Sequence, residues 1–122
     1  MHKILIVDDE RINLALVKFG LSEQRYKVFE ANDGDVALEV VKAENPDLII
    51  LDVQMPRMNG LEFMNELKML QGLDTIPVIM LTANETMQDI FTLEGVRGYF
   101  VKPVDLPSLL AKVKEILGDD PD

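Results

Sequence analysis

Four short apolar runs in this chain each end at a polar residue, and this repeated pattern strongly limits the possible folds. The runs and the polar residues after them are Ile4–Val7 before Asp8 and Asp9, Leu48–Leu51 before Asp52, Val78–Leu81 before Thr82, and Tyr99–Val101 before Lys102. Such runs are typical of fully buried strands in a parallel sheet. Because ligands of open α/β sheets bind beyond the carboxyl ends of the strands, we expect these polar side chains to converge at one edge. Carboxylates, a hydroxyl and an ammonium gathered there suit a hard cation and a phosphoryl group.

Strand and helix patterns alternate along the chain, which predicts an α/β fold with a five-stranded parallel sheet flanked by five helices. Strands are expected over 3–7, 27–31, 48–51, 78–81 and 98–101. Helices are expected over 11–23, 35–43 and 86–94, between Asn59 and Gly72, and between Asp105 and Gly118. The 122 residues fit one domain with one core, and we expect the last four residues, 119–122, to be disordered.

Local signals mark the ends and faces of these helices. Asn59 followed by Glu62 predicts a capping box, and Asn45 before Pro46 predicts a helix stop. Asp105 is a candidate N-cap. Apolar residues recur at helical spacing in the first and last helices. They are Ile12, Ala15, Leu16 and Phe19 in the first, and Leu106, Leu109, Leu110, Val113, Ile116 and Leu117 in the last.

Composition excludes several classes of function. The formal net charge of −10 makes this chain a poor candidate for binding nucleic acid or anionic membranes. The absence of cysteine excludes disulfides, thiolate metal sites and a cysteine nucleophile. No apolar stretch is long enough for a signal peptide or a membrane span, so we expect a cytoplasmic protein.

The motifs in their order resemble those of receiver domains of bacterial two-component response regulators. The matching segments are Ile4–Glu10, Pro46–Pro56, Asn59–Glu62, Leu81–Ala83 and Lys102–Pro103, and the resemblance extends from Lys3 to about Leu117. It implies a flavodoxin-like fold with strand order 2-1-3-4-5, in which the first and third strands are neighbours. It also implies a switch controlled by phosphorylation, which accepts its phosphoryl group from a sensor histidine kinase or a histidine phosphotransfer protein.

The three aspartates are the candidate metal and phosphorylation site. Crowded carboxylates repel one another unless a cation offsets them, and oxygen-only ligands suit Mg²⁺. The resemblance implies that Asp52 is the nucleophile that becomes phosphorylated. It further implies that Asp9 and Asp52 bind Mg²⁺ directly, that Asp8 acts through water, and that the Gln54 backbone carbonyl is a fourth ligand. Taken alone, the Asp8-Asp9 pair could equally form a turn or an N-cap for the following helix.

Other residues have roles implied by the same resemblance. Lys102 stabilises the phosphoryl group and, before phosphorylation, pairs with the buried aspartates; its peptide bond to Pro103 is expected to be cis. Thr82 donates a hydrogen bond to the phosphoryl group, and the small Ala83 leaves room for the donor. Tyr99 swings inward when Thr82 moves. Thr82 and Tyr99 could also be ordinary strand residues.

Two departures from the family pattern bear on the partners. The segment from Thr82 to Gly95 is shorter than usual, and Arg97-Gly98 replaces an acidic pair that forms salt bridges between subunits in many DNA-binding relatives. We therefore expect a downstream protein partner, with the chain itself a monomer or weak dimer. Nothing after the last helix could serve as an output domain, so the chain is either a complete single-domain protein or a piece of a longer one.

Three other functions fit this sequence less well than the switch does. A metal-dependent phosphatase of the haloacid-dehalogenase type would need a second acid two residues after the nucleophile, where this chain has Gln54. A nucleotide or flavin binder would need a glycine-rich loop after a strand, where Asp8, Asp9 and Glu10 stand instead. A receiver that only binds partners would not need every active-site position to be filled.

Overall fold

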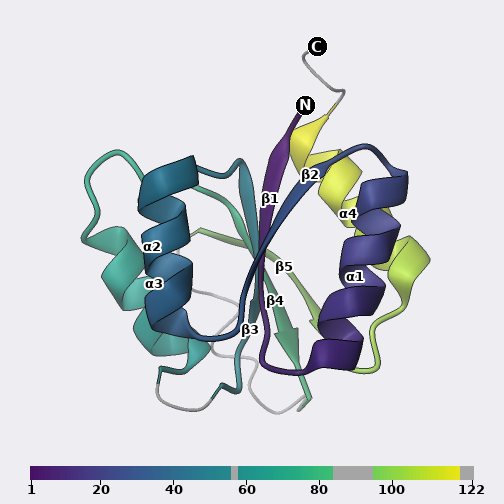
Figure 1. The fold of residues 1–122 in the computed structure, drawn as a ribbon, viewed down its shortest axis with the longest axis horizontal. Coiled ribbons are helices and arrows are strands. Elements are labelled where there is room, and N and C mark those ends of the chain that lie inside the picture. Colours follow the sequence, from purple (N-terminus) through teal and green to yellow (C-terminus); the bar gives the residue numbers. More distant parts are fainter. Residues whose placement is uncertain (56–57, 84–94, 119–122) are drawn as a thin grey trace.

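The computed structural model describes residues 1–55, 58–83 and 95–118, and within them a parallel sheet lies between two layers of helices. Figure 1 shows α1 and α4 on one face of the sheet and α2 and α3 on the other. In chain order the elements are β1 (Lys3–Val7), α1 (Arg11–Glu23), β2 (Lys27–Ala31), α2 (Gly34–Glu44), β3 (Leu48–Asp52), α3 (Gly60–Lys68), β4 (Val78–Thr82), β5 (Val96–Val101) and α4 (Leu106–Leu117).

The strand order is β2-β1-β3-β4-β5 and every pair is parallel, so the predicted fold class and topology are confirmed. The register pairs Val7 with Leu51, Asp52 with Leu81 and Thr82 with Val101. The carboxyl ends of β1, β3, β4 and β5 therefore meet at one edge. The helix expected over 86–94 and the tail at 119–122 fall outside the described residues.

The sheet is buried on both faces, which explains why its strands appear as continuous apolar runs. Every residue of β3 and β4 is buried, and side chains alternate between two cores. In β1, Leu5 and Val7 pack with α2 and α3, whereas Ile4 and Ile6 pack with α1 and α4. Burying one such side chain stabilises a fold by roughly 1.5–3 kcal/mol, so these runs fix the strands firmly. β5 differs, because it lies at the sheet edge and its residues are intermediate or exposed.

The helix boundaries follow local signals with one correction. The Asn59–Glu62 capping box is present, and α2 stops at Asn45 in a left-handed conformation, just before Pro46. However, α3 ends at Lys68 and not at Gly72. After it, backbone hydrogen bonds join residues three apart, as in Leu70 N–H to Leu67 O at 3.0 Å, and this tighter turn ends the α-helix before the glycine.

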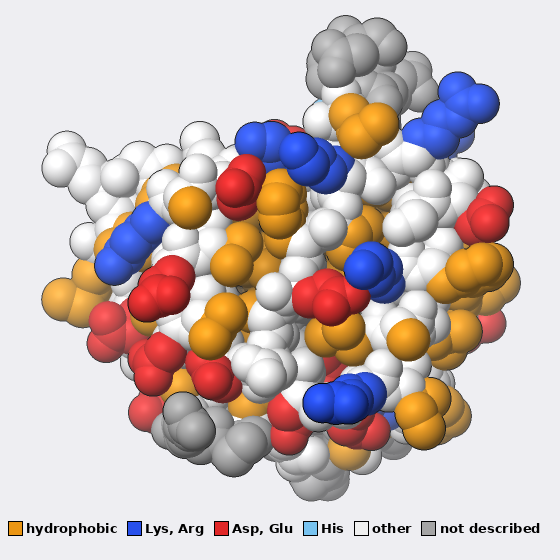
Figure 2. All heavy atoms as spheres, viewed as in Figure 1, with side chains coloured by type: hydrophobic (Ala, Val, Ile, Leu, Met, Phe, Trp, Pro, Cys, Tyr) orange, Lys and Arg blue, Asp and Glu red, His pale blue; other side chains and the backbone are white. Residues whose placement is uncertain are grey.

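The apolar residues of α1 lie on two faces of the helix, and the more conspicuous set faces outward. Val17 and Leu21 are fully buried against the sheet. By contrast, Ile12 is 87%, Leu16 46% and Phe19 64% exposed. Figure 2 shows apolar side chains at the surface on the side of the molecule where α1 and α4 lie. We call Ile12, Ala15, Leu16 and Phe19 the α1 stripe.

Two further sequence predictions can be compared with the described residues. The apolar stripe of α4 packs inward as expected, with Leu109 and Val113 fully buried in the core shared with α1. Asp105 is the N-cap residue of α4, as predicted, although its side chain accepts a hydrogen bond from the Ser108 hydroxyl and makes no capping bond to the backbone. In the described part of the chain, no helix is long and apolar enough to cross a membrane.

Candidate functional site

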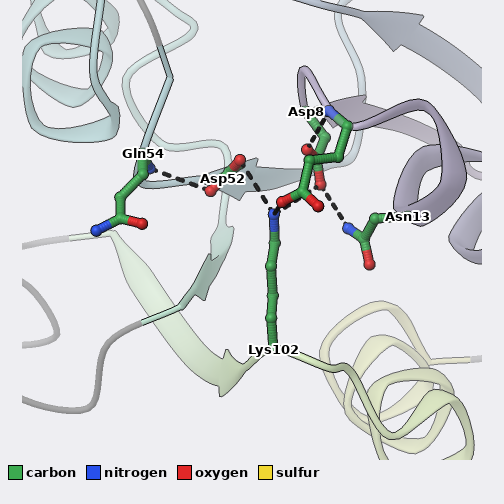
Figure 3. A network of polar contacts seen from close by, with 6 residues as sticks. Asp8, Asn13, Asp52, Gln54 and Lys102 are labelled. Atoms are coloured by element: carbon green, nitrogen blue, oxygen red, sulfur yellow. Dashed lines mark hydrogen bonds and ion pairs between the residues drawn. The ribbon is translucent and has the colours of Figure 1, made fainter.

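Polar side chains from three strand ends meet at the carboxyl edge of the sheet. Asp8 follows β1, Asp52 is the last residue of β3, and Lys102 follows β5. Figure 3 shows these three side chains pointing toward one another from separate strands. Figure 2 shows acidic side chains along the lower edge of the molecule, where Figure 1 shows the strands ending. The fold thus brings together residues that lie up to about ninety positions apart in the sequence.

One ammonium group lies within ion-pair distance of three carboxylates in this site. The Lys102 Nζ lies 2.6 Å from Glu10 Oε1, 3.1 Å from Asp52 Oδ2 and 3.4 Å from Asp8 Oδ2. The side chains of Asp8 and Asp52 are 0% and 3% exposed, and that of Lys102 is 12% exposed. These contacts confirm the predicted ion pair between Lys102 and the buried aspartates. Because removing charges from water is costly, the aspartates depend on this pairing.

Hydrogen bonds hold the two buried carboxylates in fixed orientations. The Gln54 backbone N–H donates to Asp52 Oδ1 at 3.1 Å, and the Glu10 N–H donates to Asp8 Oδ1 at 2.9 Å. The Asn13 side-chain amide donates to Asp8 Oδ2. Each aspartate therefore binds the lysine through one oxygen and a backbone N–H through the other.

Burial shifts the protonation equilibria of this cluster. Burial raises the pKa of Asp52 from 3.8 to about 6; the Gln54 N–H opposes the shift, the Asp8 charge adds to it, and Lys102 opposes it. For Lys102, burial alone would lower the pKa, but the hydrogen bond to Glu10 and the charges of Asp52 and Asp8 outweigh it, and the pKa rises above its ordinary value. The lysine is therefore charged at neutral pH, and the ionised form of Asp52 carries a cost.

This cost predicts how stability depends on pH without metal. Because the pKa of Asp52 is higher in the folded protein, about 6, than its ordinary 3.8, the folded state binds more protons between these values. The contribution of Asp52 to the unfolding free energy should fall by roughly 2 kcal/mol as pH rises from 4 to 7. Asp52→Asn cannot ionise, so the stability difference between variant and wild type should grow in favour of the variant over this range.

Urea unfolding of both proteins in chelator at pH 5 and pH 7.5 measures this difference. The comparison with Asp52→Asn cancels the titration of groups that lie away from Asp52. A difference that stays constant, or that grows in favour of the wild type, would contradict the raised pKa.

The acidic cluster has the composition of a site for a hard cation. Ligand oxygens of Asp8, Glu10 and Asp52 all lie within 4.8 Å of one another. The donors are all oxygens, two of the residues are buried, and one ammonium cannot fully balance three carboxylates, so the residues fit a divalent cation. Asp9, a predicted direct ligand, is exposed and not part of this group, although it lines a pocket beside Asp8.

The other predicted residues surround the cluster at different depths. Thr82 is fully buried at the end of β4, and its backbone carbonyl accepts from the Lys102 N–H at 2.7 Å. Ala83 is exposed in a groove that Lys102 and Pro103 also line, and the Lys102–Pro103 peptide bond is cis. Tyr99 lies on β5 opposite Met80 and is 46% exposed.

Sequence reasoning missed two residues of the site. Glu10 makes the shortest contact to Lys102, and Asn13 holds the Asp8 carboxylate. The sequence offered a signal for Glu10, which is a third consecutive acid after Asp8 and Asp9. Asn13 lies in the first turn of α1, where its side chain reaches back to the strand end. The N-cap residue of α1 is Glu10, without a side-chain capping bond, so neither Asp8 nor Asp9 is the helix N-cap; the Asp8 side chain instead accepts from the Glu10 N–H two residues on, as in a turn.

Comparison with known proteins agrees with this geometry. The family model of the response regulator receiver domain matches residues 4–114. The chain belongs to this family. As a receiver domain it is a signalling switch of two-component response regulators, and the resemblance inferred from the motifs is confirmed.

This receiver domain is similar to a part of longer curated response regulators and to nearly the whole of a solved one. It is 39% identical over 117 residues to the alkaline phosphatase synthesis transcriptional regulatory protein PhoP of Bacillus subtilis, covering 94% of this chain and 48% of that protein. It is 36% identical to the response regulator ArlR of Staphylococcus epidermidis, covering all of this chain and 55% of ArlR. The structure of the chemotaxis response regulator CheY4 of Vibrio cholerae matches with a TM-score of 0.87 and 34% identity, over 96% of this chain and 99% of CheY4. The chain thus spans about half the length of the curated relatives.

Proposed function

We propose that this receiver domain accepts a phosphoryl group on Asp52 from a phosphohistidine of a sensor kinase or a histidine phosphotransfer protein, in the presence of Mg²⁺. The observation that carries this proposal is the Asp52 carboxylate at the end of β3, 3.1 Å from the Lys102 ammonium and beside a second buried aspartate. The exchange would take place in the cytoplasm, where the sequence predicts the protein to reside.

The phosphoryl transfer needs no reactant besides Asp52 and the phosphohistidine. An Asp52 oxygen attacks phosphorus, the phosphorus–nitrogen bond to the histidine breaks, and its electron pair returns to the imidazole. The product is an acyl phosphate, which water can later hydrolyse to regenerate the Asp52 carboxylate. Lys102, 3.1 Å from Asp52, would interact with the phosphoryl oxygens as negative charge shifts during transfer.

The metal would be held by the acidic edge of the sheet. Asp8, Asp9, Asp52 and the Gln54 backbone carbonyl are the proposed ligands, directly or through water. When bound, Mg²⁺ would neutralise charge on the transferring phosphoryl oxygens. The chain's own contribution is to orient Asp52, whose pKa burial raises to about 6, through the Gln54 N–H.

The signal would leave the site through Thr82 and Tyr99. Thr82 would donate to the new phosphoryl oxygens, and the space it leaves would admit the Tyr99 ring from its half-exposed position. The β5–α4 surface then has two arrangements, of which a partner can select one. Arg97 is exposed on β5, where the acidic pair of many DNA-binding relatives is absent. We therefore favour a separate protein target and a monomer or weak dimer, without direct DNA binding by this domain.

Mass spectrometry with a small phosphodonor tests the central proposal. Acetyl phosphate and Mg²⁺ should add a single phosphoryl group to the intact protein, and peptide mapping should place it on Asp52. Chelator should prevent the reaction, because the crowded carboxylates then repel the anionic donor. An unlabelled protein at saturating Mg²⁺ would instead support a receiver that only binds partners.

We propose that the donor protein binds at the α1 stripe. Ile12 and Leu16 line the groove that also contains Lys102 and Ala83, so the apolar surface is continuous with the rim of the site. A protein that must bring a histidine to Asp52 can bury these exposed side chains with its own apolar surface. The groove therefore links donor binding to the reacting atoms.

Variants of the stripe should separate the two kinds of donor. Leu16→Ser combined with Phe19→Ser should slow phosphotransfer from a purified phosphorylated sensor kinase at least about tenfold, because two exposed apolar contacts are lost. Labelling by acetyl phosphate should change less than twofold, since neither residue reaches Asp52. Met69→Ser, at an exposed methionine after α3, serves as the matched control. Equal loss with both donors would indicate a damaged site.

A further inference from the structure

The shortest ion pair of Lys102 is made with Glu10 and not with the proposed nucleophile. Its Nζ lies 2.6 Å from Glu10 Oε1, compared with 3.1 Å from Asp52 Oδ2. Glu10 differs from the other two carboxylates because its side chain is 61% exposed, whereas Asp8 and Asp52 are almost fully buried. It stands at the N-cap position of α1, before the first residue of the helix.

Phosphorylation would create competition for this ammonium. An ammonium has three N–H donors, and three carboxylates already lie within 4 Å of Lys102. A phosphoryl group on Asp52 brings new acceptor oxygens to the same place. To bind them, Lys102 must release a partner, and Asp8 is held by Asn13 and by the Glu10 N–H. The exposed Glu10 side chain is the partner that can turn into solvent.

We propose that Glu10 is a positioning residue that acts through Lys102, holding its ammonium at the rim of the site and slowing phosphoryl capture until the pair opens. This inference rests on the proposed phosphorylation of Asp52. Glu10 also lines the groove that contains Ile12 and Leu16 of the α1 stripe. A donor protein seated on the stripe would therefore meet the Glu10 carboxylate, and displacing it would free Lys102 at the moment of transfer.

Two substitutions of Glu10 separate its contact from its charge. Glu10→Gln removes the charge, whereas Glu10→Asp keeps it but shortens the side chain by one methylene and withdraws it from Lys102. We expect both variants to be phosphorylated about two- to fivefold faster than wild type by phosphoramidate at saturating Mg²⁺, the range expected for loss of a partly exposed ion pair. Intact-mass time courses at equal protein concentration give these rates.

Matched controls isolate the role of Lys102. Glu30→Gln removes a carboxylate from the pocket beside Asp8 that pairs with Lys18 at 2.9 Å, and it should change the rate less than about 1.5-fold. In a Lys102→Met background, Glu10→Gln should no longer accelerate labelling, because the positioned ammonium is gone. The side-chain ¹⁵N resonance of Lys102 should shift in both Glu10 variants while that of Lys18 stays in place, a readout that a general change in stability would not produce.

Each other outcome has a definite meaning. If Glu10→Asp behaves like wild type, or Glu10→Gln accelerates equally without Lys102, Glu10 acts only by repelling the donor, and the inference is wrong. If Glu10→Gln is slower even at saturating Mg²⁺, Glu10 serves the metal instead, which also overturns the inference. Absence of labelling in wild type would refute the proposed function itself, whereas equal rates in labelled proteins would refute only the role of Glu10.

Discussion

Replacing Asp52 with alanine will reduce phosphoryl labelling by acetyl phosphate and Mg²⁺ to background, at least about a hundredfold below wild type. The reason is chemical: the substitution removes the attacking oxygen, and the other buried carboxylate, Asp8, is oriented by Asn13 and the Glu10 N–H. The measurement is the phosphorylated fraction in intact-mass spectra over time.

Asp47→Ala is the matched control for this loss. Asp47 directly precedes β3, as Asp52 ends it, but Asp47 lies at the opposite edge of the sheet, where its carboxylate accepts from the Lys3 N–H at 2.8 Å. Its removal should leave the labelling rate within about twofold of wild type. Labelling of Asp52→Ala at the wild-type rate would show that the phosphoryl group goes elsewhere and would remove the central proposal.

Replacing Lys102 with alanine will destabilise the metal-free protein by about 2–4 kcal/mol. The substitution leaves Asp8 and Asp52, both almost fully buried, without their shared ammonium, and uncompensated buried charge is far more costly than a lost surface pair. Mg²⁺ should restore part of this loss, because a divalent cation in the same cluster supplies positive charge to the folded state only. Urea unfolding in chelator and in Mg²⁺ gives both quantities.

Lys18→Ala controls for the loss of a lysine as such. Lys18 pairs with Glu30 at 2.9 Å, but both side chains are substantially exposed, 50% and 39%, so its removal should cost less than about 1 kcal/mol and should not respond to Mg²⁺. If Lys102→Ala is no less stable than Lys18→Ala in chelator, then Lys102 is not what makes the buried aspartates tolerable.

The topology and the outline of the site could be predicted because both depend on local pattern. Apolar runs fixed the buried strands, and their polar ends had to meet at one edge once the strands were parallel. The face of α1 could not be predicted in this way. Val17 and Leu21 recur at helical spacing just as Leu16 and Phe19 do, and only packing against the sheet decides which pair is buried. The early end of α3 likewise depends on how the chain after Lys68 turns back toward the core.

Neighbouring residues at a strand end were also hard to assign from sequence. Asp8 and Asp9 are consecutive, but the chain bends at Asp9 directly after β1, and one side chain is buried while the other is exposed. Glu10, at the start of α1, approaches Lys102 only because β5 pairs with β4 and ends near the start of α1. These two segments lie some ninety residues apart in the sequence. No short window of sequence contains that relation.

The place of each strand within the sheet has a mechanical consequence for the switch. Asp52 ends β3, which is paired on both sides and fully buried, whereas Lys102 follows β5, which is paired only with β4. The proposed nucleophile thus lies in the interior of the sheet, held by a strand on each side, and its counter-charge follows an edge strand that is held on one side only. When the charge on Asp52 changes, we expect β5 to move more readily than β3. We therefore expect a change of charge at the central strand β3 to become a movement of the edge strand β5.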